Sequence, residues 1–498
     1  MSDATAVRRA AHRVVLGAFD GTEVPAWVPA LVDAGLGGIC LYGNNLSAGP
    51  EAAAALAREI STAAPTLALA LDEEGGDVTR LHYTTGSPYP GNAVLGRVDD
   101  LATTRAVAAA IGAELKDAGV WLNLAPDADI NSNPRNPVIG TRSFGADPDL
   151  VARHTAAWVE GLQALGVAAC VKHFPGHGDT SADSHVALPR VDADLATLRA
   201  RELVPFVAAV GAGAATVMTS HLVLPALDPD HPATMSRRIL TGLLREEMGF
   251  DGVIVTDALD MAGASATLGV PAAAVASLAA GADLLCIGPS LRGRGADDVL
   301  DVVDAVVAAV AAGSLASSRL FDAAARVDAL CAAYGTGAAP YDPSVVSAGR
   351  EAGRRAATLA TDPVGPLPPG RPLVLRLESG ANMAVGEAAW GDLGIPDAEV
   401  RAVRGDVPDT AEVVAHPGPV LVMGRSIAAD PEVWSWVRTL VTSRPDTVVV
   451  ELGWPSPEVA ALPRVVRGWG AAQPPSQAVG AAVVRAEREA FPPDGEER

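Results

Sequence analysis

The chain of 498 residues is 49% hydrophobic and 19% charged, which is enough apolar material for a full core and excludes a mainly disordered protein. Its net charge of −22 arises from 59 acidic and 37 basic residues, so its surface repels phosphates, and neither nucleic acid nor an anionic membrane is an expected partner. At roughly 150 residues per domain, with one large α/β barrel absorbing about 250 or more, we expect one large and one smaller domain.

The N-terminus and the cysteines favour a cytoplasmic protein. The first residues, MSDATAVRRAAHRVV, contain basic side chains but no apolar stretch of signal-peptide length. Cys40, Cys170, Cys286 and Cys331 are far apart, and the first three lie in apolar runs. Such cysteines are typical of buried thiols in a reducing compartment.

Short apolar runs recur over about the first 335 residues, each followed by a longer Ala-rich stretch with helical spacing. Continuous rather than alternating hydrophobicity is typical of parallel strands that are buried on both faces. Eight runs predict a TIM-type (β/α)8 barrel, while an open doubly wound sheet would give the same local pattern. The expected strands are Arg13–Ala18, Gly38–Tyr42, Leu67–Leu71, Val120–Leu124, Val167–Val171, Ala215–Thr219, Val253–Thr256 and Asp283–Ile287.

After the barrel the composition shifts to Gly, Pro and Ala, which is typical of a linker. We expect residues 1–335 to form the catalytic barrel, 336–370 the linker and 371–498 a small α/β sandwich domain. An Arg-rich helical piece, 348–359, interrupts the linker. Strand-like runs in the last segment lie at Leu373–Leu377, Val420–Met423 and Thr447–Leu452. We expect this domain to be structural or to tune substrate access.

Polar residues gather where the predicted strands stop, and the densest group is the segment VKHFPGHGDTSADSH, residues 171–185. In a barrel, the carboxyl ends of all strands open onto one mouth, where active sites are built. A loop containing proline and two glycines continues neither a helix nor a strand, so its polar side chains decorate no regular element. Three histidines within thirteen residues therefore favour a site over chance surface positions. The polar residues are Lys172, His173, His177, Asp179, Asp183 and His185.

Three more segments point to the same mouth. In LLREEMGFDGVIVTDALDM, residues 243–261, a buried strand delivers Asp257 to its end, where a carboxylate is either a helix cap or a nucleophile. In LDEEGGDVTRL, residues 71–81, Asp72 ends a strand and Arg80 follows a glycine turn. Arg142 lies in IGTRSFG, after the fourth strand. Either arginine is compatible with an ordinary surface ion pair, but together with Lys172 they would make a pocket for a neutral polyhydroxylated ligand.

These motifs resemble glycoside hydrolase family 3, and specifically its bacterial β-N-acetylglucosaminidase (NagZ-like) branch. The resemblance covers about the first 340 residues and rests on KHFPGHGDT followed by DSH, on LLREEMGFDGVIVTDALD, and on DEEGG followed by an arginine. One departure is Asp77, where relatives usually carry a basic residue, and it predicts an altered rim or distal subsite.

The resemblance implies roles for individual residues. Asp257 would be the catalytic nucleophile, His185 the general acid/base and Asp183 the group that orients His185. His177 and Asp179 would shape the loop. The residues that would hold the hydroxyl and acetamido groups of the nonreducing sugar are Asp72, Arg80, Arg142, Lys172 and His173.

The chemistry of these residue types agrees with that implication. Retaining glycosidases usually use two carboxyl groups about 5 Å apart, one as nucleophile and one as acid. Histidine titrates near neutrality, so His185 can protonate the leaving group and then deprotonate water, while the carboxylate of Asp183 fixes its tautomer. We therefore expect a retaining exo-β-N-acetylglucosaminidase that releases terminal N-acetylglucosamine from muropeptides during cell-wall recycling or from related oligosaccharides, without a metal or organic cofactor.

Two alternatives change the chemistry. Phosphate in place of water would make the enzyme a phosphorylase, which phosphate-dependent formation of a sugar 1-phosphate would reveal. A metal-dependent hydrolase would use His173, His177, Asp179 and His185 as ligands, but Pro175 and two glycines disfavour the helix that an i, i+4 histidine pair needs.

Overall fold

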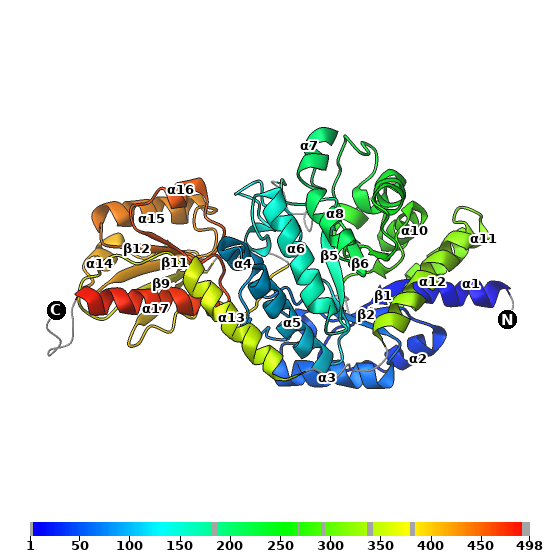
Figure 1. Ribbon diagram of the computed structural model, residues 1–498, viewed down its shortest axis with the longest axis horizontal. Helices are drawn as coiled ribbons and strands as arrows, with labels where there is room; N and C mark the ends of the chain where they lie inside the picture. The colour runs from blue at the N-terminus through cyan, green and yellow to red at the C-terminus, as the bar shows by residue number, and fades with distance from the viewer. Residues whose placement is uncertain are drawn as a thin grey trace.

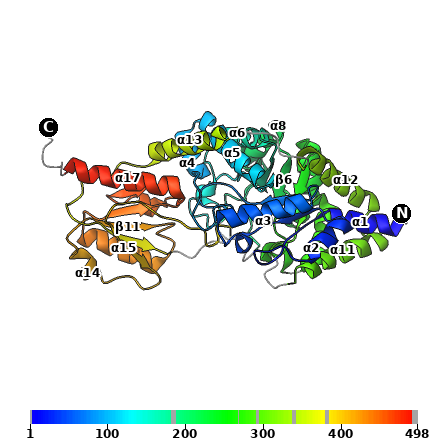
Figure 2. The same ribbon diagram turned by 90° about the horizontal axis from the view of Figure 1, so that it is seen from below.

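The computed structural model describes residues 3–180, 188–266, 268–289, 294–335, 342–378 and 384–490. Two parallel sheets organise the chain, one of eight strands and one of five. Each sheet forms the centre of its own body, and the two bodies lie next to each other along the long axis (Figures 1 and 2). Helices α1 (Asp3–Arg13) and α17 (Gln473–Ala490) lie at opposite ends of the molecule. The predicted fold class, a barrel followed by a smaller α/β domain, is confirmed.

The first sheet is a barrel in the order β7-β6-β5-β4-β3-β2-β1-β8, and every pairing is parallel. Between its two end strands, Val255 bridges to Leu284, and the amide of Asp283 donates to the carbonyl of Ile254 over 2.8 Å. These contacts close the ring, so the open-sheet alternative is wrong. The strands are β1 (Val15–Gly17), β2 (Gly38–Cys40), β3 (Ala68–Leu71), β4 (Leu122–Asn123), β5 (Ala168–Phe174), β6 (Thr216–Thr219), β7 (Val253–Val255) and β8 (Leu285–Cys286).

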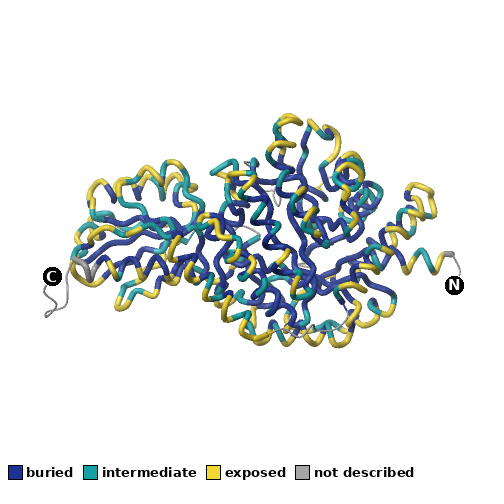
Figure 3. Tube along the Cα trace, viewed as in Figure 1, coloured by how far each residue is buried: buried dark blue, intermediate teal, exposed yellow. Residues whose placement is uncertain are grey.

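Helices surround the barrel and bury one face each against it. Two of the longest begin at aspartates that cap the helix: Asp100 accepts from the amide of Ala102, and Asp147 accepts from the amide of Leu150. The outer faces of the helices are exposed, while the strands are buried (Figure 3). The helices are α2 (Trp27–Ala34), α3 (Pro50–Ala63), α4 (Asn92–Val98), α5 (Leu101–Asp117), α6 (Pro148–Gln163), α7 (Leu195–Ala200), α8 (Val204–Gly211), η4 (Arg238–Glu247, π-helical), α9 (Ala262–Ser265), α10 (Val270–Ala280), α11 (Ala296–Ala311) and α12 (Ser317–Tyr334).

The barrel interior is filled with small and aliphatic side chains. Cys40, Cys170 and Cys286 belong to one buried apolar cluster together with alanines and leucines of the neighbouring strands. All four cysteines are buried and none forms a disulfide, as the sequence predicts. The interior is therefore a packed core, and polar chemistry is confined to the ends of the strands.

Helix α13 (Ser344–Ala360) lies within the segment expected to be a linker. It packs against α5 of the barrel and against α17 of the second body. Glycines permit the close approach: a Cβ on Gly349 would lie 2.3 Å from that of Ala110, and one on Gly353 would lie 2.6 Å from Cδ of Pro90. Arg350 forms an ion pair with Glu114 of α5. The segment thus joins the two bodies through packed contacts.

The second sheet has the order β10-β9-β11-β12-β13 and is also entirely parallel. Alternate residues of its central strands face opposite layers: Leu373 and Leu375 pack with α15, and Val374 packs with α17. The strands are β9 (Leu373–Leu377), β10 (Glu399–Val403), β11 (Val420–Gly424), β12 (Val448–Glu451) and β13 (Val465–Arg467), and the remaining helices are α14 (Thr410–Val414), α15 (Pro431–Ser443) and α16 (Pro457–Ala460).

Candidate active site

A pocket of about 200 Å³ opens at the carboxyl end of the barrel strands. Its apolar lining includes Leu124, Met218 and Met261. The pocket also collects every described residue that the sequence analysis expected to react with or bind the sugar. Asp183 and His185 lie outside the described residues. The expected residues that line the pocket are Asp72, Arg80, Arg142, Lys172, His173 and Asp257.

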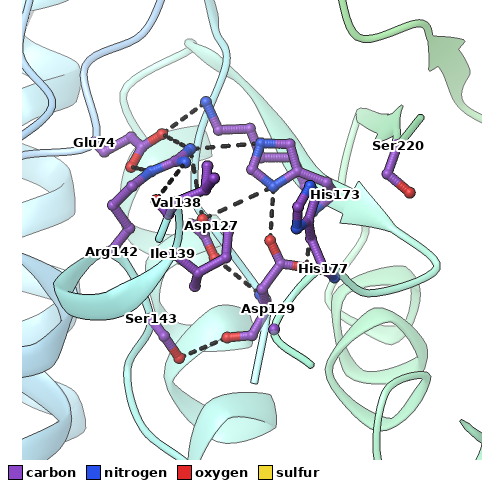
Figure 4. Close-up of polar contacts among 12 residues, drawn as sticks. Glu74, Asp127, Asp129, Val138, Ile139, Arg142, Ser143, His173, His177 and Ser220 are labelled. Atoms are coloured by element: carbon purple, nitrogen blue, oxygen red, sulfur yellow. Dashed lines mark hydrogen bonds and ion pairs between the residues drawn. The ribbon is translucent and has the colours of Figure 1, made fainter. Parts of the chain in front are cut away.

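Glu74 is the centre of an ion-pair network on the pocket wall (Figure 4). Its carboxylate accepts from Arg142 twice, with Nη2–Oε1 and Nε–Oε2 distances of 2.7 and 2.9 Å. The Nζ of Lys172 lies 2.7 Å from Oε1 of Glu74 and 2.6 Å from Oδ1 of Asp72. The DEEGG motif predicts Asp72 as a site residue, whereas Glu74 was not expected in the site. The signal available for Glu74 was a second acidic residue in the same motif as Asp72, in a pocket where Lys172 and arginines were expected and needed an acidic partner.

The network fixes the charge of each member. Burial alone would raise the pKa of Glu74, but the charges of Arg142 and Lys172 outweigh it and hold that pKa well below its ordinary value. Burial would lower the pKa of Lys172, whereas Asp72 and Glu74 hold that pKa above its usual range. Glu74, Arg142 and Lys172 therefore stay charged across the neutral range, and the donors and acceptors on this wall are preorganised.

His173 is a neutral hydrogen-bonding group on the same wall. Strand β5 extends through Phe174, three residues beyond the expected end, so Lys172 and His173 belong to the strand itself. The Nδ1 of His173 donates to Oδ2 of Asp129 over 2.6 Å, and Nε2 lies 3.4 Å from Nη2 of Arg142. Burial and the charge of Arg142 lower the pKa of His173 to about 4. Asp129 was missed from the sequence.

The described start of the histidine-rich loop is anchored to the barrel. The amide of His177 donates to Oδ1 of Asp129 over 2.6 Å, and the Nδ2 of Asn136 donates to the carbonyls of His177 and Gly178. A Cβ on Gly178 would lie 1.6 Å from the carbonyl oxygen of Ile130, so only glycine permits this approach. Asp179 forms an ion pair with Arg201 over 2.5 Å. His177 and Gly178, at the described start of the loop, are therefore fixed to the barrel.

Asp257 follows β7 by two residues and directs its carboxylate into the pocket. Its Oδ1 accepts from the amide of Ala258 over 2.8 Å. Its negative charge opposes the lowering of the His173 pKa by burial and by Arg142. Asp260 also lines the pocket, and a Cβ on Gly288 would lie only 1.8 Å from its Oδ1. Two carboxylates thus follow β7, and both are accessible from the pocket.

Asp127, Asp129 and His173 have ligand atoms within 4.8 Å of one another and are all buried. Oδ2 of Asp129 is already bonded to the His173 ring, and Oδ2 of Asp127 lies 3.5 Å from Nη2 of Arg142. Burial and the adjacent charge of Asp129 raise the pKa of Asp127 to about 7. Of the atoms that would bind a metal, Oδ2 of Asp129 therefore holds the His173 ring, while Oδ2 of Asp127 lies beside the Arg142 guanidinium without a hydrogen bond. Of the other expected metal ligands that the structure describes, His177 bonds through Nδ1 to the hydroxyl of Thr180 over 2.9 Å, and Asp179 is paired with Arg201.

The second body contributes to the pocket through Ala384. The Nη2 of Arg80 donates to the carbonyl of Ala384 over 2.8 Å and lies 3.7 Å from Oδ2 of Asp72. Asp77, the departure noted in the sequence, accepts from the amide of Ala471 over 2.8 Å and from the hydroxyl of Thr141 over 2.9 Å. The side chain at this position thus ties the two bodies together beside the pocket.

Comparison with known proteins identifies the family. The family model "Glycosyl hydrolase family 3 N terminal domain" matches residues 22–330. The chain belongs to glycosyl hydrolase family 3. The family predicted from the histidine-loop and Asp257 motifs is therefore confirmed, and the matched range covers the barrel from α2 to α12.

Individual family 3 relatives extend this result. A β-hexosaminidase A of Pseudoalteromonas piscicida is 42% identical over 244 residues, which are 46% of this chain and 41% of that protein. A β-hexosaminidase of Stenotrophomonas maltophilia (strain R551-3) is 38% identical over 256 residues, 50% of this chain and 75% of that protein. The chain thus spans less than half of the first relative and three quarters of the second. A family 3 β-N-acetylglucosaminidase structure from Paenibacillus sp. str. FPU-7 superposes with a TM-score of 0.84 at 31% identity and covers 96% of this chain and 97% of its own.

Within the described parts of the chain, no helix combines the length and the apolar character needed to cross a membrane.

Proposed function

We propose that this family 3 protein is a retaining exo-β-N-acetylglucosaminidase that removes terminal nonreducing N-acetylglucosamine. The observation that supports this most directly is the shared pocket. Asp257 lines the same small cavity as the five residues expected to bind the sugar, which are Asp72, Arg80, Arg142, Lys172 and His173. Relatives described as β-hexosaminidases and as a β-N-acetylglucosaminidase give the substrate class.

In the proposed reaction the carboxylate of Asp257 attacks the anomeric carbon while His185 donates its proton to the glycosidic oxygen. The aglycone leaves with that proton, and the sugar remains as an ester of Asp257. His185 then takes a proton from water, the resulting oxygen attacks the anomeric carbon, and Asp257 is released. Asp183 is proposed to orient His185 and to stabilise its protonated form.

The proposed role of the pocket wall is to bind the hydroxyl and acetamido groups of the sugar. Asp72, Arg80 and Lys172 offer charged donors and acceptors whose partners hold them in place before substrate arrives. His173 is neutral near pH 7 because its pKa is about 4, so it offers a hydrogen bond without adding a charge. A neutral sugar suits a wall whose own charges are already paired.

We further propose that the substrates are peptidoglycan turnover fragments and that the enzyme acts in the cytoplasm. Four buried thiols without disulfides fit a reducing compartment. The choice between muropeptides and chitin oligosaccharides depends on the aglycone.

The test compares hydrolysis of the nitrophenyl β-N-acetylglucosaminide with that of the β-glucoside, with and without inorganic phosphate. We expect strong preference for the acetamido sugar and release of free N-acetylglucosamine in both buffers. Asp257→Asn should lower kcat at least about a thousandfold, because no covalent intermediate forms. Asp260→Asn is the matched control, since it removes a carboxylate from the same segment and pocket, and it should lose far less. Preference for the glucoside, a sugar 1-phosphate product, or full activity of Asp257→Asn would contradict the proposal.

A further inference from the structure

The carboxyl edge of the second sheet lies against the barrel and carries a group that the proposed reaction does not use. The strand order reverses between β9 and β11, because the chain runs outward to β10 and then returns to the other side. In open parallel sheets, ligands bind in the crevice outside the carboxyl ends of the strands at such a reversal. Here β9 is followed by Glu378 and β11 by Arg425.

Arg425 is half-buried, with its guanidinium carbon 4.4 Å from the centre of the Trp390 ring. Its guanidinium makes no hydrogen bond or ion pair to any residue that the structure describes. Arg376 is a useful contrast, because its guanidinium also lies over Trp390, at 5.6 Å, but is paired with Glu378 over 2.6 Å. Two arginines thus share one indole, and only Arg376 uses its donors within the described protein.

The Trp390–Arg425 pair lies at the junction between the second body and the barrel, near the segment that carries Asp77. The residues on either side of Trp390 are held in place, since Ala389 donates to the carbonyl of Tyr83 over 3.1 Å and Gly391 donates to that of Ala471 over 3.1 Å. Ala471 in turn donates to Asp77, whose neighbour Val78 lines the pocket. The pair is therefore connected, through Ala471 and Asp77, to the wall of the pocket on the side of the second body.

The surroundings of Arg425 leave its charge available. The carboxylates that act on it are Asp77 and Glu378, and both already accept hydrogen bonds, Asp77 from Ala471 and Thr141 and Glu378 from Arg376. Burial lowers the pKa of Arg425, although a guanidinium stays protonated at neutral pH. A planar fork of unused donors that rests on an indole is suited to bind a carboxylate in bidentate fashion.

We propose that Arg425, supported by Trp390, binds a carboxylate on the aglycone of the substrate and so makes the enzyme selective for acidic aglycones over neutral ones. The inference rests on the proposed glycosidase function and refines its substrate class. A lactyl carboxylate on the sugar next to the scissile bond has the required chemistry, whereas a chitin oligosaccharide offers no such anion.

The test uses N-acetylglucosaminyl-β-1,4-N-acetylmuramic acid and its methyl ester, which differ only in the charge of the lactyl group. For each protein the readout is the ratio of kcat/KM for the acid to that for the ester, so that a general loss of activity cancels. We expect a ratio of about ten for the wild type and about one for Arg425→Gln. Arg425→Lys should retain part of the ratio, and Arg401→Gln, which removes an exposed arginine of β10 in the same sheet, should keep the wild-type ratio. Circular dichroism and thermal unfolding establish that each variant is folded.

Three results would overturn the inference. A wild-type ratio of one, with normal cleavage of the nitrophenyl N-acetylglucosaminide, removes the anion site and leaves the proposed function intact. An unchanged ratio in folded Arg425→Gln assigns the selectivity to another residue. Absence of cleavage of every N-acetylglucosaminide by the wild type refutes the proposed function, and the inference falls with it.

Discussion

The barrel and the second sheet both present charged side chains at the carboxyl ends of parallel strands, but they use these charges differently. In the barrel, Glu74 neutralises Arg142 and Lys172 within a buried network. At the edge of the second sheet, Arg425 lies on Trp390 without a described ionic partner. A wall with paired charges is rigid and suits a neutral sugar, whereas an unpaired guanidinium suits an anion. In the proposed function, the same architectural position thus serves two kinds of recognition.

The largest effect on stability should come from the barrel side of this comparison. Glu74→Gln removes the carboxylate shared by Arg142 and Lys172 and leaves two buried cations undercompensated, so we expect a loss of about 3–5 kcal/mol in the free energy of unfolding, measured with urea. Glu160→Gln breaks the exposed pair with Arg105 and should leave that free energy unchanged. Equal stability of the two variants would mean that the network is not a buried, mutually dependent unit.

The junction between the two bodies should give an intermediate effect. Asp77→Ala leaves the amide of Ala471 and the hydroxyl of Thr141 without their acceptor, so we expect a loss of about 1–3 kcal/mol in the free energy of unfolding. Asp77→Asn keeps an acceptor oxygen and should lose less. Calorimetry of both variants measures the difference, and wild-type stability of Asp77→Ala would show that Asp77 does not join the two bodies.

The last expected effect depends on pH and concerns the residue that supports the segment after Arg425. Glu451 is buried at the end of β12 and accepts from the amides of Ser426, Ile427 and Gly453 over 2.8–3.0 Å, which holds the segment after Arg425 in place. Burial raises the pKa of Glu451 from its ordinary value of 4.5 to about 7 despite these hydrogen bonds. Between these two values the native state binds a proton that the unfolded state has released, so the stability contribution falls as pH rises through that window.

Glu451→Gln removes this titration. As the pH rises from about 5 to about 8, the Tm of the wild type should fall relative to that of the variant, as followed by thermal unfolding in matched buffers. A difference that stays constant over this range would show that Glu451 does not titrate there.

Much of the fold could be predicted because burial on both faces leaves a local mark. Each of the eight apolar runs overlaps one barrel strand, and β9, β11 and β12 were found in the same way. Strand β10 was missed, since as an exposed edge strand it reads Glu-Val-Arg-Ala-Val and lacks an apolar run. Strand β13 has only three residues, of which one is buried. Helix α13 was found as a helical piece, but its packing on two bodies depends on contacts distant in sequence.

The site was predictable where a motif carries it and not where the fold assembles it. Asp72, Lys172 and Asp257 stand at or near strand ends, so their shared pocket follows from barrel topology. The contact between Arg80 and Ala384 joins residues 304 positions apart, and no local pattern encodes it. The reversal of strand order that gives Arg425 its position likewise appears only once the sheet is assembled.

The most direct test of the central claim is to trap the covalent intermediate. Incubation with a 5-fluoro-N-acetylglucosaminyl fluoride, followed by proteolysis and mass spectrometry, should place one fluorosugar ester on the peptide that contains Asp257, because the fluorine slows hydrolysis of the intermediate. Excess N-acetylglucosamine should protect against labelling, and Asp257→Asn should not be labelled. A stable ester on any other carboxylate, Asp260 included, or turnover of the reagent without an adduct, would contradict the assignment of Asp257 as nucleophile.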